Sequence, residues 1–177
     1  GSSVGASKAE NKEELQASVK EAFLWDDKIL IEPFIEAREI ECSVTGNTEF
    51  TAYTPGEVVS SHSFYDYDAK YNDPNGAQLL IPADLDDAHL RTVREISKKA
   101  YRVLDLTGLA RVDFFLDKKT DNFYLNEINT IPGFTSISMF AKMCEASGLN
   151  YSELIEKLFE LAIIRFKNRA VLKTSRA

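Results

Sequence analysis

Four polar residues recur at two-residue spacing late in this sequence. Arg111 and Asp113 stand in one short apolar stretch, and Glu127 and Asn129 stand in the next. Carboxylate and amide oxygens are the ligands that Mg²⁺ takes in proteins, usually beside phosphate oxygens and water. A guanidinium answers the negative charge of a phosphoryl group or of a tetrahedral intermediate. These residue types therefore indicate metal-assisted phosphate chemistry.

A β-hairpin is the element that would bring these four side chains together. Apolar residues at 109–116 and 123–129 flank a turn at 117–122, which predicts two paired strands. If the turn is centred on Thr120, Asp113 faces Glu127. Side chains alternate faces along a strand, so the odd positions share one side: Arg111, Asp113, Phe115, Phe123, Leu125, Glu127 and Asn129. On spacing alone, a solvated hairpin end with ordinary salt bridges remains the alternative.

The rest of the chain predicts antiparallel strands followed by helices. Further strands are expected at about 28–35, 38–45, 48–54 and 78–81, and helices at about 11–25, 84–104, 138–146 and 152–167. Pro33 removes a backbone donor, so the first strand should lie on an edge or stop there. The stretch 61–77 is rich in aromatic residues and lacks periodicity, as loops that close over a site often do. The fold class is therefore α+β.

Composition bounds the class of protein. The chain has 177 residues, 44% of them hydrophobic, which is enough for a sizeable core. Its net charge of −7 argues against nucleic acid as a partner, since such a partner needs a basic surface. No apolar run approaches a membrane span and no signal peptide is evident, so we expect a cytoplasmic protein. Cys42 and Cys144 are expected to be buried, reduced thiols.

Six stretches of this sequence resemble the C-terminal part of D-alanine–D-alanine ligases. They are ARVDFF, YLNEINTIPGFTSISM, GLNYSELIEKLFELA, FYDYDAKY, EPFIEAREIECSV and the opening GSSVG. Together they cover nearly the whole chain in the family's order and spacing. The resemblance implies an ATP-grasp fold, an antiparallel sheet packed with helices. It also implies three parts: 1–60 as the remainder of a central ATP-binding subdomain, 61–77 as a mobile lid loop, and 78–177 as the catalytic subdomain.

The resemblance assigns roles to single residues. Asp113, Glu127 and Asn129 match a site for two Mg²⁺ ions, for which Mn²⁺ is a possible substitute. Five further residues match catalytic positions. Arg111 matches a residue that contacts phosphate, Gly133 one whose N–H binds an oxyanion, and Ser138, together with Met139, one that binds the acceptor carboxylate. Lys70 matches a residue that reaches the γ-phosphate, and Tyr71 one that connects the lid to the substrate. Eight residues match nucleotide-binding positions. The positions around adenine are Glu32, Phe34, Ile35 and Phe115, and Glu39 matches the residue that binds the ribose hydroxyls. The positions at the triphosphate are Ser2, Ser3 and Lys70.

The activity implied by the resemblance is the ATP-dependent joining of two D-alanines through an acyl phosphate, for peptidoglycan synthesis. The family's N-terminal domain has no counterpart in this sequence, so we expect that domain as a partner and little or no ligase activity from the chain alone. A homodimer is possible. The alternatives are a related D-alanine–D-lactate or D-alanine–D-serine ligase, or a non-catalytic nucleotide- or metal-binding module.

Overall fold

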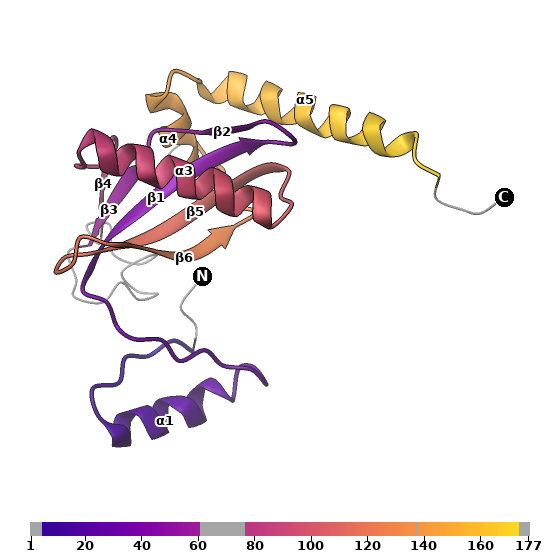
Figure 1. Cartoon of the computed structure of the whole chain (residues 1–177). Helices are drawn as coiled ribbons and strands as arrows, with labels where there is room; N and C mark the ends of the chain where they lie inside the picture. Colours follow the sequence, from indigo (N-terminus) through magenta and orange to yellow (C-terminus); the bar gives the residue numbers. More distant parts are fainter. Residues whose placement is uncertain (1–4, 61–76, 137, 174–177) are drawn as a thin grey trace. The chain divides into compact units, whose positions relative to one another are not determined.

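The computed structural model describes residues 5–60, 77–136 and 138–173 (Figure 1). The chain divides into two compact units, which are described separately. Gly1–Glu36 and Ser60–Gln78 form the first unit, and Ala37–Val59 and Leu79–Ala177 form the second.

The first unit contains helix α1 (Lys12–Ala22). Its N-cap is Asn11, whose side chain accepts a hydrogen bond of 2.9 Å from the Glu14 N–H, so the predicted start is confirmed. The strand predicted at 28–35 is wrong, because this segment is described and holds no strand. Leu30 is 83% exposed, so its apolar residues do not meet a paired neighbour that would bury them.

The second unit is built on a six-stranded sheet with the order β4-β3-β1-β5-β6, and β2 pairs with β1. The strands are β1 (Ala37–Gly46), β2 (Phe50–Ala52), β3 (Gly56–Ser60), β4 (Ala77–Leu80), β5 (Gly108–Asp117) and β6 (Phe123–Asn129). Strand β1 pairs antiparallel with β2, β3 and β5, and β5 pairs antiparallel with β6. The predicted antiparallel architecture is confirmed.

Strand β3 was not expected from the sequence. Its Glu57 is buried and paired with Arg38 of β1 through hydrogen bonds of 2.8 and 2.7 Å. A buried charge interrupts the apolar alternation by which short strands are recognised. The polar pair therefore concealed a strand that the fold does contain.

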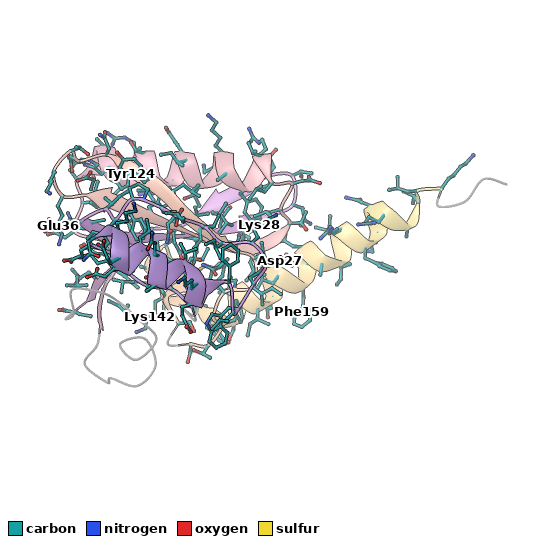
Figure 2. The ribbon with its side chains drawn as sticks, turned by 90° about the horizontal axis from the view of Figure 1, so that it is seen from below. Asp27, Lys28, Glu36, Tyr124, Lys142 and Phe159 are labelled. Carbon is teal, nitrogen blue, oxygen red and sulfur yellow. The ribbon has the colours of Figure 1, made fainter. Side chains whose placement is uncertain are left out.

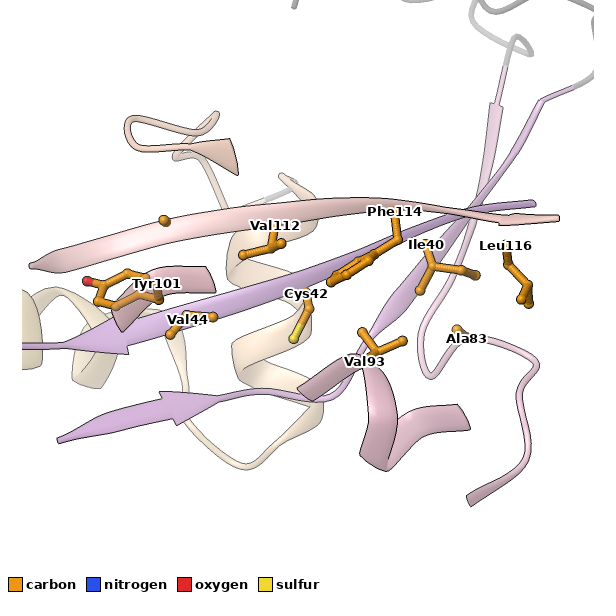
Figure 3. Packing of buried hydrophobic residues seen from close by; sticks show 10 residues of the cluster. Ile40, Cys42, Val44, Ala83, Val93, Tyr101, Val112, Phe114 and Leu116 are labelled. Atoms are coloured by element: carbon orange, nitrogen blue, oxygen red, sulfur yellow. The ribbon is translucent and has the colours of Figure 1, made fainter. Parts of the chain in front are cut away.

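One face of β1 and β5 carries the main core (Figure 3). Ile40, Cys42 and Val44 of β1 are fully buried at successive even positions, because side chains alternate faces along a strand. The even positions of β5 join them, and helix α3 (Asp87–Val103) covers the layer with Val93 and Tyr101. This face is packed throughout with apolar side chains.

The opposite face of the same strands is covered at one end only by helices α4 (Met139–Ala146) and α5 (Tyr151–Ala170). The Ser43 hydroxyl on β1 donates to the Phe140 carbonyl at 3.1 Å, and Phe140 and Leu154 are fully buried. Beyond Ser43 the odd face becomes charged. None of the helices in the described part of the chain is long and apolar enough to cross a membrane.

Candidate metal and phosphate site

The hairpin β5–β6 aligns the four polar residues as the sequence predicted. Arg111 pairs with Asn129 and Asp113 pairs with Glu127 in the strand register. Because side chains two residues apart share a face, all four project to the odd side of the sheet. The expected juxtaposition of two carboxylates, one amide and one guanidinium is thus confirmed.

The predicted face is wrong for the apolar residues of β6, Phe123 and Leu125. The register shifts between Asp113 and Phe114, so Phe115 pairs with Tyr124, and Leu116 pairs with Phe123. Strand β5 keeps an unbroken pairing with β1, so the extra residue lies in β6. It exchanges the faces of the β6 residues between it and the turn, whereas Phe115 of β5 stays on the odd face. Phe123 accordingly packs against the even-face core, where its ring lies 6.2 Å from that of Phe114. Tyr124, labelled on β6 in Figure 2, stands opposite Phe115 instead.

Arg111 and Asp113 form a bidentate ion pair on β5. The Arg111 Nε–H donates to Asp113 Oδ1 at 2.7 Å, and the Nη2–H donates to Oδ2 at 2.8 Å. Burial lowers the pKa of the Arg111 guanidinium, but the hydrogen bonds to Asp113 and the neighbouring carboxylate charges outweigh burial and raise it. Arg111 is therefore a fixed positive charge on this face.

Asn129 connects the two carboxylates of the hairpin. Its Nδ2 amide donates to Asp113 Oδ2 at 2.9 Å and to Glu127 Oε1 at 3.2 Å. One small group carrying partial positive charge thus already bridges the oxygens of both strands. If the amide turns about its last torsion, its oxygen faces the same point instead of its nitrogen.

Glu41 is the residue of this cluster that the sequence analysis did not assign. It lies on β1 opposite Asp113, and its Oε2 is 3.0 Å from Arg111 Nε. Burial, followed by the negative charge of Asp113, raises the pKa of Glu41, and the positive charge of Arg111 opposes that rise. Glu41 lies on the same side of β1 as Glu39 and Ser43, since side chains alternate faces along a strand. What was missing was the pairing of β1 with β5.

These donors fit Mg²⁺ by their chemistry. All three are hard oxygen ligands, and Mg²⁺ is normally held by one or two carboxylates together with substrate phosphates rather than by a protein cage. Within the described residues no three His, Cys, Asp or Glu side chains are grouped to hold a metal ion. The proposed site has two carboxylates and one amide, so phosphate oxygens would have to complete it.

Gly133 and Ser138 lie together in the loop between β6 and α4. A Cβ added to Gly133 would stand 3.4 Å from the Ser138 hydroxyl oxygen. That oxygen accepts the Thr135 N–H at 3.0 Å and contacts the Thr135 hydroxyl at 2.8 Å. Ser138 is the N-cap residue of α4 but makes no side-chain cap bond to it. Met139, the first residue of α4, is buried.

The expected nucleotide residues are placed unequally. Glu39 and Phe115 face each other across β1 and β5, on the same side as Arg111 and Asp113. Glu32, Phe34 and Ile35 belong to the first unit and are described there only; Phe34 is 56% exposed and has the Lys8 ammonium 4.5 Å above its ring. Ser2, Ser3, Lys70 and Tyr71 lie outside the described residues.

A separate cavity of about 600 Å³ lies between α5 and the start of β5. Its lining is largely apolar and includes Leu109, Leu158, Leu161 and Phe166. None of the predicted site residues that the structure describes lines it, so the charged face and this cavity are distinct features.

Comparison with known proteins identifies relatives over nearly the whole chain. The family model described as D-ala D-ala ligase C-terminus matches residues 1–160. A D-alanine–D-alanine ligase of Treponema denticola is 64% identical over 176 residues, which are 99% of this chain and 48% of that protein. A ligase of the same name from Caldicellulosiruptor bescii is 50% identical with the same coverage. The chain therefore spans about half the length of the curated relatives it matches.

Solved structures agree with the sequence relatives. The D-alanine–D-alanine ligase of Coxiella burnetii superposes with a TM-score of 0.82 at 38% identity, covering 96% of this chain and 44% of that one. The VanG D-Ala:D-Ser ligase of Enterococcus faecalis gives 0.81 at 34% identity, covering 91% and 46%. These scores confirm the predicted ATP-grasp fold.

Proposed function

Since this chain belongs to the family of D-alanine–D-alanine ligase C-termini, we propose that it is the ATP- and metal-binding half of an enzyme that joins two D-alanines. The product, D-alanyl-D-alanine, is a precursor of peptidoglycan. The observation that carries the proposal is the convergence of Asp113, Glu127 and Asn129 beside Arg111 on one sheet face.

The residues of this face would have separate roles in binding the metal ion and the phosphoryl group. Asp113, Glu127 and Asn129 would hold Mg²⁺, and bound Mg²⁺ would neutralise charge on the phosphate oxygens. Arg111 would bind the phosphoryl group as it passes from ATP to the carboxylate of the first D-alanine. The catalysis asked of the chain is positioning and charge neutralisation rather than covalent chemistry.

The neighbouring residues would complete the substrate sites. Gly133 would offer its N–H to the oxyanion of the acyl intermediate, and Ser138 would bind the carboxylate of the second D-alanine near the start of α4. Glu39 and Phe115 would contact ribose and adenine, together with Glu32, Phe34 and Ile35. Ser2, Ser3, Lys70 and Tyr71 would cover the triphosphate. We retain the three parts 1–60, 61–77 and 78–177 in this proposal.

A D-alanine–D-serine ligase is the second candidate, because the VanG D-Ala:D-Ser ligase superposes almost as well as the D-alanine–D-alanine ligase. Acceptor choice depends on the groups around Ser138 and on Tyr71 of the lid. Competition between D-alanine, D-serine and D-lactate as acceptors separates these readings, and we expect D-alanine to be used most efficiently.

The ligase activity itself is tested by two preparations of the protein. The chain alone should form little or no D-alanyl-D-alanine from ATP and D-alanine. The chain joined to the N-terminal half of its Treponema denticola relative should form it, and Asp113→Asn should abolish that formation. Full turnover by the chain alone would refute the need for a second half. No turnover by any joined form would refute the proposed reaction.

A further inference from the structure

Arg111 lies between carboxylates from two neighbouring strands. Its Nε is 2.7 Å from Asp113 Oδ1 on its own strand and 3.0 Å from Glu41 Oε2 on β1. An Nε atom carries a single hydrogen, and here that hydrogen is directed at Asp113. Glu41 Oε2 therefore stands at hydrogen-bonding distance from a donor that is already engaged.

The Glu41 oxygen is left without a hydrogen bond at a buried position. The side chain of Glu41 is only 13% exposed, and its Oε2 has no hydrogen-bond partner among the described residues. An unsatisfied buried carboxylate oxygen is costly, since it has lost water without gaining a donor. Such a group in a folded protein calls for an explanation.

A second buried glutamate in the same sheet shows that the fold does not require this arrangement. Glu57 of β3 has a side chain 7% exposed, and both of its carboxylate oxygens accept hydrogen bonds from Arg38, at 2.8 and 2.7 Å. The sheet can thus accommodate a fully satisfied arginine–glutamate pair. At Glu41 the Arg111 Nε–H is instead directed at Asp113, and Glu41 Oε2 has no hydrogen-bond partner among the described residues.

Metal binding at Asp113 would change the hydrogen bonding of Arg111. The proposed ligand Asp113 uses both oxygens to hold Arg111, and Oδ2 also accepts from Asn129. An oxygen that coordinates a cation becomes a poorer acceptor for a second positive group. Arg111 would then lose part of its anchor at the moment when it must bind phosphate.

We propose that Glu41 is the positioning residue that takes over the Arg111 Nε–H when Asp113 engages Mg²⁺. In the cation-free protein Arg111 is held by Asp113. With the cation bound, Glu41 Oε2 receives the Nε–H after a small shift and keeps the guanidinium on the same face. Glu41 would therefore act through Arg111 and contact neither nucleotide nor metal. This inference rests on the proposed metal site.

The test follows the Arg111 Nε–H signal of the isotope-labelled chain by NMR, with and without excess Mg²⁺. In the unsubstituted protein its exchange with water should stay slow in both conditions. In Glu41→Gln it should stay slow without Mg²⁺ and become on the order of tenfold faster with Mg²⁺, because a hydrogen bond between charged groups is weakened. A merely structural role for Glu41 would not depend on Mg²⁺.

The control is Glu57→Gln, which weakens the other buried arginine–glutamate pair. It should leave the Arg111 signal unchanged in both conditions. If Glu41→Gln does not fold, Glu41→Asp replaces it, since the shorter side chain withdraws the carboxylate from Nε and should give the same Mg²⁺-dependent loss.

The other outcomes each overturn a defined statement. Equal Arg111 exchange in Glu41→Gln and the unsubstituted protein with Mg²⁺ would refute the positioning role. A Mg²⁺ affinity weakened as much in Glu41→Gln as in Asp113→Asn would make Glu41 a ligand instead. If Mg²⁺ added in the presence of a non-hydrolysable ATP analogue leaves the Asp113 and Glu127 signals of the unsubstituted protein unmoved, the metal site itself is refuted, and the role of Glu41 falls with it.

Discussion

The two faces of strands β1 and β5 use the same backbone for opposite purposes. On the even face, Cys42, Val44 and Val112 are fully buried beneath α3. On the odd face, the same strands carry Glu41, Arg111 and other charged groups, which α4 and α5 leave uncovered. Alternation places each kind of side chain on its own side. The even face therefore stabilises the sheet, and the odd face carries the charge cluster that we propose as the cation and phosphate site.

Phe114 and Phe115 are adjacent in the sequence but lie on opposite faces. Their substitution should give the largest difference in stability between the two faces. Phe114 is 1% exposed on the even face, so Phe114→Ala should lower the free energy of unfolding by about 3–5 kcal/mol. Phe115 is half-buried on the odd face, so Phe115→Ala should lower it by less than about half as much. Urea unfolding of both variants measures the difference, and equal losses would show that the faces are not distinct.

Substitution of Asn129 tests whether a cation can bind between the side chains of the odd face. Asn129→Asp replaces the amide that bridges Asp113 and Glu127 with a third negative charge, so it should destabilise the cation-free protein by roughly 1–3 kcal/mol. Excess Mg²⁺ should restore most of that loss in thermal unfolding.

The matched control for this variant is Asn126→Asp, an exposed position on the same strand. It should change the melting temperature little and should not respond to Mg²⁺. A melting temperature of Asn129→Asp that stays low with Mg²⁺ would argue against a cation between these side chains.

The pKa and reactivity of the Cys42 thiol depend on how completely water is excluded from the even face. Burial raises its pKa to about 11, and burial raises that of Cys144, under α5, to about 12. At pH 8 both groups are therefore protonated in the folded protein, and the thiolate fraction grows only as the pH approaches these values. Reaction with a disulfide reagent at pH 8 should be about two orders of magnitude slower than after unfolding in urea. Rapid labelling of the folded chain would mean that the layer under α3 opens readily.

The sequence predicted the fold where local pattern and pairing agreed. The alternation in β1 and the two-residue spacing in β5 and β6 were sufficient to place Asp113 opposite Glu127. The start of the first helix at Asn11 followed from its capping residue. The approximate limits of four helices were also within reach, because their apolar spacing is regular.

The remaining errors have physical causes. A register shift after Asp113 leaves no mark in the hairpin's alternation, so Phe123 and Leu125 were assigned to the wrong face. The buried Glu57 concealed β3. The apolar residues of 28–35 suggested a buried strand, yet Leu30, Ile31 and Phe34 are exposed in this chain. Glu41 was missed because its environment depends on which strand lies beside β1, and non-local pairing is not encoded in local spacing.

The central claim is that Asp113, Glu127 and Asn129 hold a divalent cation beside nucleotide phosphate. Its most direct test adds small amounts of Mn²⁺ and a non-hydrolysable ATP analogue to the isotope-labelled chain and measures the paramagnetic broadening of backbone amides. Broadening should be greatest at these three residues and should disappear from them in Asp113→Asn. Broadening centred elsewhere, or unchanged by that substitution, would contradict the account.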